Sequence, residues 1–151
     1  MKNIQSLIFL LLVLFIFSCD KNSIDFTCCD FEISYENDYD LIGSWSLVGI
    51  VQKNPLREEC ADGGWVIFND DGTIGGSSSC NQLLGKYKLN SSNGIVIESL
   101  VQTLRGCVGN ESIYWEKKFP SELREAEKYK IDGNKMIIYT LSGNQLVFIA
   151  F

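Results

Sequence analysis

Alternating apolar and polar residues mark short β-strands through most of the chain after residue 41. In the first run, residues 43–50, Trp45 and Leu47 fall on one face, and Ser44 and Ser46 fall on the other. A period of two is typical of a half-buried strand. Because Gly-, Asn- and Asp-rich turns follow at short intervals, we expect a small antiparallel β-barrel or sandwich of about eight strands. The remaining strands are predicted at residues 65–68, 73–79, 84–89, 95–97, 101–105, 129–131, 136–141 and 146–151.

One stretch, residues 111–126, has helical periodicity instead. Trp115, Phe119, Leu123 and Ala126 are spaced by four, four and three positions, which places them on one face of a helix. We expect this face to pack against the sheet. Pro120 lies inside the stretch and removes a helical hydrogen bond, so the helix is expected to kink or break there. The pattern therefore predicts a mainly β domain with one helix before the C-terminal hairpins.

The beginning of the chain has the pattern of an export signal. Lys2 precedes an uninterrupted apolar run at residues 7–17, which as a helix would be about 16 Å long. A bilayer core is roughly 30 Å thick, so the run is short for a spanning helix and is typical of a secretory signal peptide.

Residues 16–19 (IFSC), which end this segment, resemble the lipobox of bacterial lipoproteins. In such proteins the chain is cut before the cysteine, whose thiol is lipidated. The resemblance implies that residues 1–18 are removed, that Cys19 carries lipid, and that the protein is anchored in the bacterial cell envelope. The sequence leaves open which membrane holds it.

Composition and charge narrow the possible functions. The chain has 151 residues and a net charge of −6. It contains no histidine, which excludes Ser-His-Asp catalysis, Cys-His catalysis and His-liganded zinc. An acidic protein is also poorly suited to the phosphate backbone of nucleic acids. Residues 19–40 are polar and acidic, and we expect them to be a flexible tether between the membrane and one domain at residues 41–151.

A series of short motifs runs through the domain in a fixed order. They are residues 43–47 (GSWSL), 66–72 (VIFNDDG), 75–81 (GGSSSCN), 85–87 (GKY), 103–107 (TLRGC), 129–131, 133–136 and 143–148, with Phe119 and Leu123 in the predicted helix. The order of these motifs resembles the META domain, the HslJ-like family of small bacterial envelope proteins. The resemblance implies a compact antiparallel β-barrel with one helix, and it brings no established catalytic activity and no cofactor.

The six cysteines suggest disulfides, because export favours them. Cys80 and Cys107 match two positions where many family members have cysteine, and the resemblance implies that they lie on facing strands and form a bridge. Cys60 lies in a polar segment and is a candidate to pair with Cys28 or Cys29. A zinc site made of these thiolates is disfavoured because no C-x-x-C spacing is present. The adjacent Glu58 and Glu59 are expected in a solvated loop rather than as a catalytic pair.

Three classes of function are weighed. We expect a non-enzymatic envelope lipoprotein that binds an unknown protein partner or acts under stress, held to the membrane by lipid on Cys19 and otherwise monomeric. The alternative is a carrier of a small hydrophobic ligand inside the barrel, which is disfavoured if Trp45, Trp65, Phe68 and Phe148 fill the interior. A hydrolase is disfavoured because no nucleophile has a base beside it.

Overall fold

The computed structural model describes residues 40–90 and 92–151. The segment at residues 1–18 and nearly all of the segment at 19–40 lie outside these residues, as do Cys19, Cys28 and Cys29. The predictions made for them therefore stay predictions. Within the described residues, no helix is both long and apolar enough to cross a membrane.

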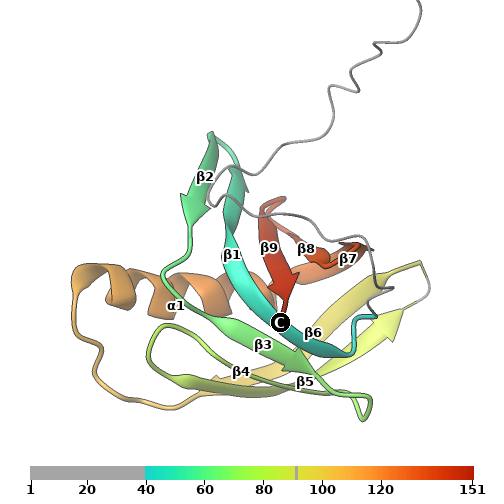
Figure 1. Cartoon of the computed structure of the whole chain (residues 1–151), viewed down its shortest axis with the longest axis horizontal. Coiled ribbons are helices and arrows are strands. Elements are labelled where there is room, and N and C mark those ends of the chain that lie inside the picture. The colour runs from blue at the N-terminus through green and yellow to red at the C-terminus, as the bar shows by residue number, and fades with distance from the viewer. Residues whose placement is uncertain (1–39, 91) are drawn as a thin grey trace, which may run out of the picture.

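The described residues form one antiparallel sheet that closes into a barrel (Figure 1). The sheet order is β2-β1-β3-β4-β5-β6-β7-β8-β9, and β1 pairs with β9 to close eight of these strands. The predicted small β-barrel with one helix is confirmed. The elements are β1 (Gly43–Lys53), β2 (Leu56–Cys60), β3 (Trp65–Phe68), β4 (Thr73–Ser77), β5 (Gln82–Asn90), β6 (Gly94–Gln102), α1 (Asn110–Arg124), β7 (Ala126–Asp132), β8 (Lys135–Thr140) and β9 (Gln145–Ala150).

Strand β1 is long because it pairs with three other strands. Its first part pairs with β3, its last part pairs with β2, and most of its length pairs with β9 on the other side. A register shift between Leu47 and Gly49 bends it. The paired ends of β1 and β2 project from the barrel as a two-stranded extension (Figure 1).

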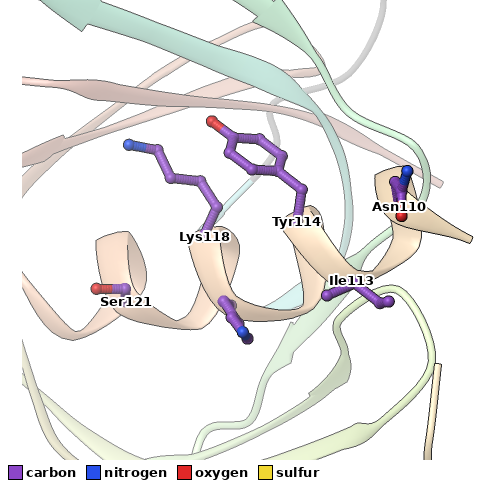
Figure 2. A pocket seen from close by; sticks show the side chains of 6 residues that line it. Asn110, Ile113, Tyr114, Lys118 and Ser121 are labelled. Atoms are coloured by element: carbon purple, nitrogen blue, oxygen red, sulfur yellow. The ribbon is translucent and has the colours of Figure 1, made fainter.

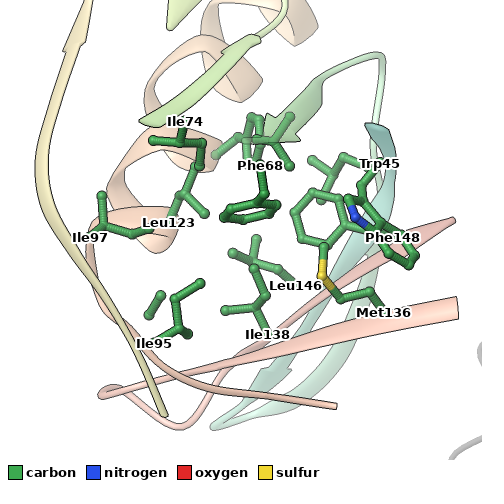
Figure 3. Packing of buried hydrophobic residues seen from close by; sticks show 14 of the residues in the cluster. Trp45, Phe68, Ile74, Ile95, Ile97, Leu123, Met136, Ile138, Leu146 and Phe148 are labelled. Carbon is green, nitrogen blue, oxygen red and sulfur yellow. The ribbon is translucent and has the colours of Figure 1, made fainter. Parts of the chain in front are cut away.

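Large apolar side chains fill the barrel interior. Trp45 is 1% exposed, and Phe68 and Phe148 are 0% exposed. Figure 3 shows Phe68 at the centre of this core, with Leu123 of the helix on one side and Phe148 on the other. The predicted inward position of Trp65 is wrong. Trp65 alternates with buried Val66 along β3 and is half-buried on the outside of the barrel.

Helix α1 packs its predicted apolar face against the barrel. Trp115, Phe119 and Leu123 all belong to the buried core, and the rings of Phe119 and Phe148 lie 6.0 Å apart. The predicted break at Pro120 is wrong, because α1 is one helix with this proline inside it. An interior proline costs about 3 kcal/mol. Burial of the three large side chains on both sides of it outweighs that cost, at roughly 1.5–3 kcal/mol for each.

Two strand predictions also need correction. The polar segment around Cys60 is a strand, β2, which pairs with β1 instead of forming a loop. The two short strands predicted at residues 95–97 and 101–105 are one strand, β6, which ends at Gln102. Glu98 and Ser99 interrupt the sequence pattern, but they point outward and leave the strand continuous.

Candidate functional site

A disulfide joins the β4–β5 turn to the loop between β6 and α1. Cys80 and Cys107 are bonded, with their Cα atoms 5.9 Å apart. The structure thus brings these two predicted residues together, but not on facing strands. Cys80 lies in a tight turn, in which the Ser78 amide donates to the carbonyl of Asn81 at 2.9 Å. The bridge holds the loop at residues 103–109 against this turn.

The side chain of Asn81 holds the same loop a second time. Its Oδ1 accepts hydrogen bonds from the Arg105 amide at 2.6 Å and from Thr103 Oγ1 at 2.9 Å. Its Nδ2 donates to the Arg105 carbonyl at 3.1 Å. Asn81 is only 3% exposed, so these bonds are shielded from water. The amide thereby pairs with the Arg105 backbone as a neighbouring strand would.

A buried carboxylate from α1 binds the other side of the turn. Glu116 is 7% exposed, and its Oε2 accepts from Ser78 Oγ at 2.6 Å, from the Cys80 amide at 2.9 Å and from the Asn81 amide at 3.2 Å. Its Oε1 accepts from Gln102 Nε2 at 2.7 Å. Burial raises the pKa of Glu116, but the hydrogen bonds from Ser78, Cys80 and Asn81 outweigh it, so that the pKa is lowered. Glu116 is therefore a carboxylate that fixes the turn to the helix.

This cluster is poorly arranged for catalysis or for metal binding. Ser78 lies beside a carboxylate, but it is 2% exposed and cannot meet a substrate. The lowered pKa also makes Glu116 a weak base. Ligand atoms of Cys80, Cys107 and Glu116 lie within 4.8 Å of one another. The two sulfur atoms are, however, bonded to each other, and metals bind the free thiolate.

A second buried carboxylate on α1 reaches the β8–β9 turn. Glu122 accepts from Asn144 Nδ2 at 3.0 and 3.1 Å and forms an ion pair with Lys118 at 2.8 Å. Asn144 in turn accepts from the Lys53 amide at 3.1 Å. Glu116 and Glu122 together fasten the helix to two turns of the barrel. The sequence pattern predicted neither carboxylate as buried, because a glutamate beside an apolar stripe normally faces water.

The exposed side of α1 carries a shallow depression of about 470 Å³, lined by Asn110, Ile113, Tyr114, Lys117, Lys118 and Ser121. Tyr114 and Lys118 project to one side of the helix and Ile113 projects away from them (Figure 2), so the side chains do not converge on one ligand. Tyr114 donates to Glu59 Oε2 at 2.5 Å. Burial, followed by this hydrogen bond, raises the pKa of Tyr114 to about 12. The contact ties β2 to the helix and keeps the phenol protonated.

The outer side of the sheet carries almost no charge where strands β3, β4, β5 and β6 lie side by side, at residues 65–68, 73–77, 82–86 and 99–102. Along these strands, buried residues such as Val66, Ile74 and Leu83 point inward, so the residues between them point outward. Lys86 is the only charged residue in this outward set, which we call the β3–β6 wall. The wall consists of Trp65, Ile67, Thr73, Gly75, Ser77, Gln82, Leu84, Lys86, Ser99 and Val101.

An apolar row crosses the middle of the wall. The strand register places Ile67 opposite Gly75, Gly75 opposite Leu84, and Leu84 opposite Val101. Leu84 is 62% exposed and Val101 is 65% exposed. A side chain at Gly75 would meet no atom within 4 Å, so the row is open there. Outward charges begin directly beyond the wall on two of the same strands, with the ion pair between Lys88 of β5 and Glu98 of β6 at 2.5 Å, and they continue on strand β7.

The profile of the META domain family matches residues 40–150. The chain is a member of the META domain family. This match covers most of the chain and agrees with the barrel and helix described above.

Solved structures share the fold of this META domain at low sequence identity. The NMR structure of a protein from Burkholderia xenovorans is similar with a TM-score of 0.63 at 16% identity, over 81% of this chain and 95% of that one. The crystal structure of a DUF4847 family protein from Bacteroides vulgatus is similar with a TM-score of 0.55 at 17% identity, over 71% and 91%. No curated protein sequence matches the chain. At these identities the similarity concerns the fold alone.

The other predicted residues that the structure describes belong to β2. Cys60 ends β2 and is disulfide-bonded, whereas its candidate partners Cys28 and Cys29 lie outside the described residues. Glu58 and Glu59 are on β2 and not in a solvated loop. The Glu59 side chain is 11% exposed and lies 3.7 Å from Arg57.

Proposed function

We propose that this META domain protein is a lipid-anchored, non-enzymatic binding protein of the bacterial cell envelope, and that the β3–β6 wall binds a protein partner. The observation that carries the proposal is the lack of charge on this wall, in which Leu84 and Val101 are more than half exposed. Depletion of charged residues distinguishes the centre of a protein interface from ordinary surface. Burial of Leu84 and Val101 by a partner would contribute roughly 1–2 kcal/mol for each.

The disulfide-linked cluster supports a role in binding, because it makes one end of the wall rigid. Glu116 fixes the turn that precedes Gln82, and Asn81 and the disulfide fix this turn to the adjoining loop at residues 103–109. A surface held in one conformation loses little entropy when a partner binds.

A non-enzymatic role is supported by the residues themselves. The chain has no histidine, and Ser78 and Glu116, the hydroxyl and carboxylate that lie together, are both buried. A carrier function has less support, since large side chains such as Phe68 and Phe148 occupy the barrel interior.

The lipid anchor is proposed from residues 1–19 and has its own test. Inhibition of lipoprotein signal peptidase in cells should leave an uncut precursor that is heavier by the mass of residues 1–18. Replacement of Cys19 by Ser should also prevent labelling by a radioactive fatty acid. Unchanged processing in the presence of the inhibitor would refute the anchor.

Site-specific photocrosslinking of the full chain in cells tests the wall. We place p-benzoylphenylalanine at position 84 and, in a matched control, at position 141, which is a leucine of similar exposure (73%) in the β8–β9 turn. The expected result is a discrete protein adduct from position 84 and none from position 141. Equal adducts from both positions, or no adduct from position 84, would contradict binding at the wall.

A further inference from the structure

Two cations flank the apolar row, one on each side of it along the strand direction. Lys86 is two residues beyond Leu84 on β5, and Arg105 is held next to Asn81 by a backbone hydrogen bond of 2.6 Å. Five residues of extended chain separate position 81, just before β5, from position 86 on β5, which corresponds to about 17 Å at 3.3 Å per residue. Leu104, in the loop next to Arg105, is 96% exposed.

Neither cation is neutralised within the part of the chain that the structure describes. The ion pairs there join Arg57 to Glu59, Lys88 to Glu98, Lys118 to Glu122 and Lys130 to Asp132. Asp71 lies close enough to Lys86 for the lysine charge to help lower the pKa of Asp71. The Asp71 carboxylate, however, accepts hydrogen bonds from the Thr73 amide at 2.9 Å and from Thr73 Oγ1 at 2.6 Å. Lys86 and Arg105 are thus both exposed, and neither has an ion-pair partner among residues 40–90 and 92–151.

The wall itself contains no carboxylate, which decides what kind of surface fits it. A second copy of the chain docked wall to wall would bring Lys86 and Arg105 against like charges. A lipid surface would favour several clustered cations, whereas this surface has two that are far apart. Neutral hydrogen-bonding groups border the apolar row on both sides, with Thr73 and Ser99 next to Lys86 and with Ser77 and Gln82 on the side of Arg105, and such groups suit a polypeptide.

From this arrangement, and resting on the proposed function, we infer that the partner presents a polypeptide segment with apolar side chains in its middle and carboxylates near both ends. The apolar side chains lie on the row formed by Ile67, Gly75, Leu84 and Val101. The carboxylates, about 15–20 Å apart, pair with Lys86 and Arg105. The open space at Gly75 receives one of the apolar side chains.

The test repeats the crosslinking from position 84 in the full chain with charge-reversed variants. In K86E/R105E the adduct yield should fall about tenfold, which corresponds to about 1.4 kcal/mol. The matched control is K117E/K128E, which reverses two exposed lysines of α1 and β7, and its yield should stay unchanged. Mass spectrometry of the crosslinked peptide should find Asp or Glu on both sides of the apolar contact. Replacing those acids with Lys should restore the yield in K86E/R105E.

Each other outcome overturns part of the inference. Full adduct yield in K86E/R105E would refute the acidic partner while leaving binding at the wall intact. An adduct that is extracted by organic solvent would identify a lipid surface instead of a protein. An adduct of twice the mass of the chain would identify a second copy. If the chain without charge-reversal substitutions gives no adduct from position 84, the proposed function itself is refuted.

Discussion

Replacement of Glu116 by glutamine removes one charge from the buried cluster and changes almost nothing else. The amide has the same size as the carboxylate, and its oxygen can still accept from Ser78 Oγ and from the amides of Cys80 and Asn81. The new NH₂ group faces Gln102, whose own amide can rotate to present its oxygen. The variant therefore tests the charge of Glu116 and not its volume.

The expected loss of stability follows from these hydrogen bonds. A bond to a charged acceptor contributes about 1.5–3 kcal/mol, and one to a neutral acceptor contributes about 0.5–1.5 kcal/mol. Three bonds to Oε2 would therefore lose roughly 3 kcal/mol together. Desolvation of a carboxylate is no longer required on folding, which offsets part of this loss. We expect the free energy of unfolding of E116Q to be lower by about 2 kcal/mol at pH 7.

The effect should depend on pH with a definite sign. The pKa of Glu116 in the folded protein lies below its ordinary value, so the folded state favours the ionised form. The charge therefore stabilises the protein fully above the unfolded pKa of about 4.3, and this contribution is lost as the pH falls through the folded pKa. The difference between wild type and E116Q should accordingly shrink below about pH 4.

Urea denaturation followed by tryptophan fluorescence measures both quantities. The wild type, E116Q and the control E127Q are compared at pH 7 and at pH 3. Glu127 is exposed on β7, so its replacement should change stability by less than about 0.5 kcal/mol at either pH. An E116Q variant as stable as wild type at pH 7, or equally destabilised at pH 7 and pH 3, would refute the role of the buried charge.

Three further variants test the disulfide and the packing around the wall. The free energy of unfolding of the C80S/C107S double variant should be about 3–4 kcal/mol lower than that of the oxidised protein, because the bridge joins residues with a sequence separation of 27; urea denaturation without reductant measures this, and equal midpoints would contradict it. Gly76→Ala should cost about 1–3 kcal/mol, because its Cβ would lie 2.3 Å from the Trp65 carbonyl oxygen. Gly75→Ala, on the open side of the same strand, should be within about 0.5 kcal/mol of wild type. Thermal unfolding followed by circular dichroism should give a lower melting temperature for Gly76→Ala than for Gly75→Ala.

The alternation of apolar and polar residues could predict only the strands that have one buried face and one exposed face. β1 and β3 follow the expected alternation because one side of each meets the core. β2 has no such side: it pairs with β1 outside the closed barrel, so its sequence (LREEC) carries no apolar alternation. The helix was predictable from its apolar stripe. Its continuity through Pro120 was not, because that depends on the packing of Trp115, Phe119 and Leu123 against the barrel.

The candidate site was predictable only in part. The resemblance to the META family pointed to Cys80 and Cys107, which the structure joins. Glu116 carried no signal, because its four hydrogen-bond donors come from residues 14 to 38 positions away in the chain. Nothing local to residue 116 distinguishes a glutamate that caps a distant turn from one that faces solvent.

Sequence alone was enough for the mainly β class, the single helix and the family, because each depends on the local period of apolar residues or on motifs in chain order. Tertiary structure decided which residues form the β3–β6 wall, that Lys86 is the charged residue on it, and that Arg105 is held beside it by Asn81. Strand register sets the membership of the wall, and register depends on pairing between separate segments of the chain. A surface with almost no charge is therefore visible only after the barrel has closed.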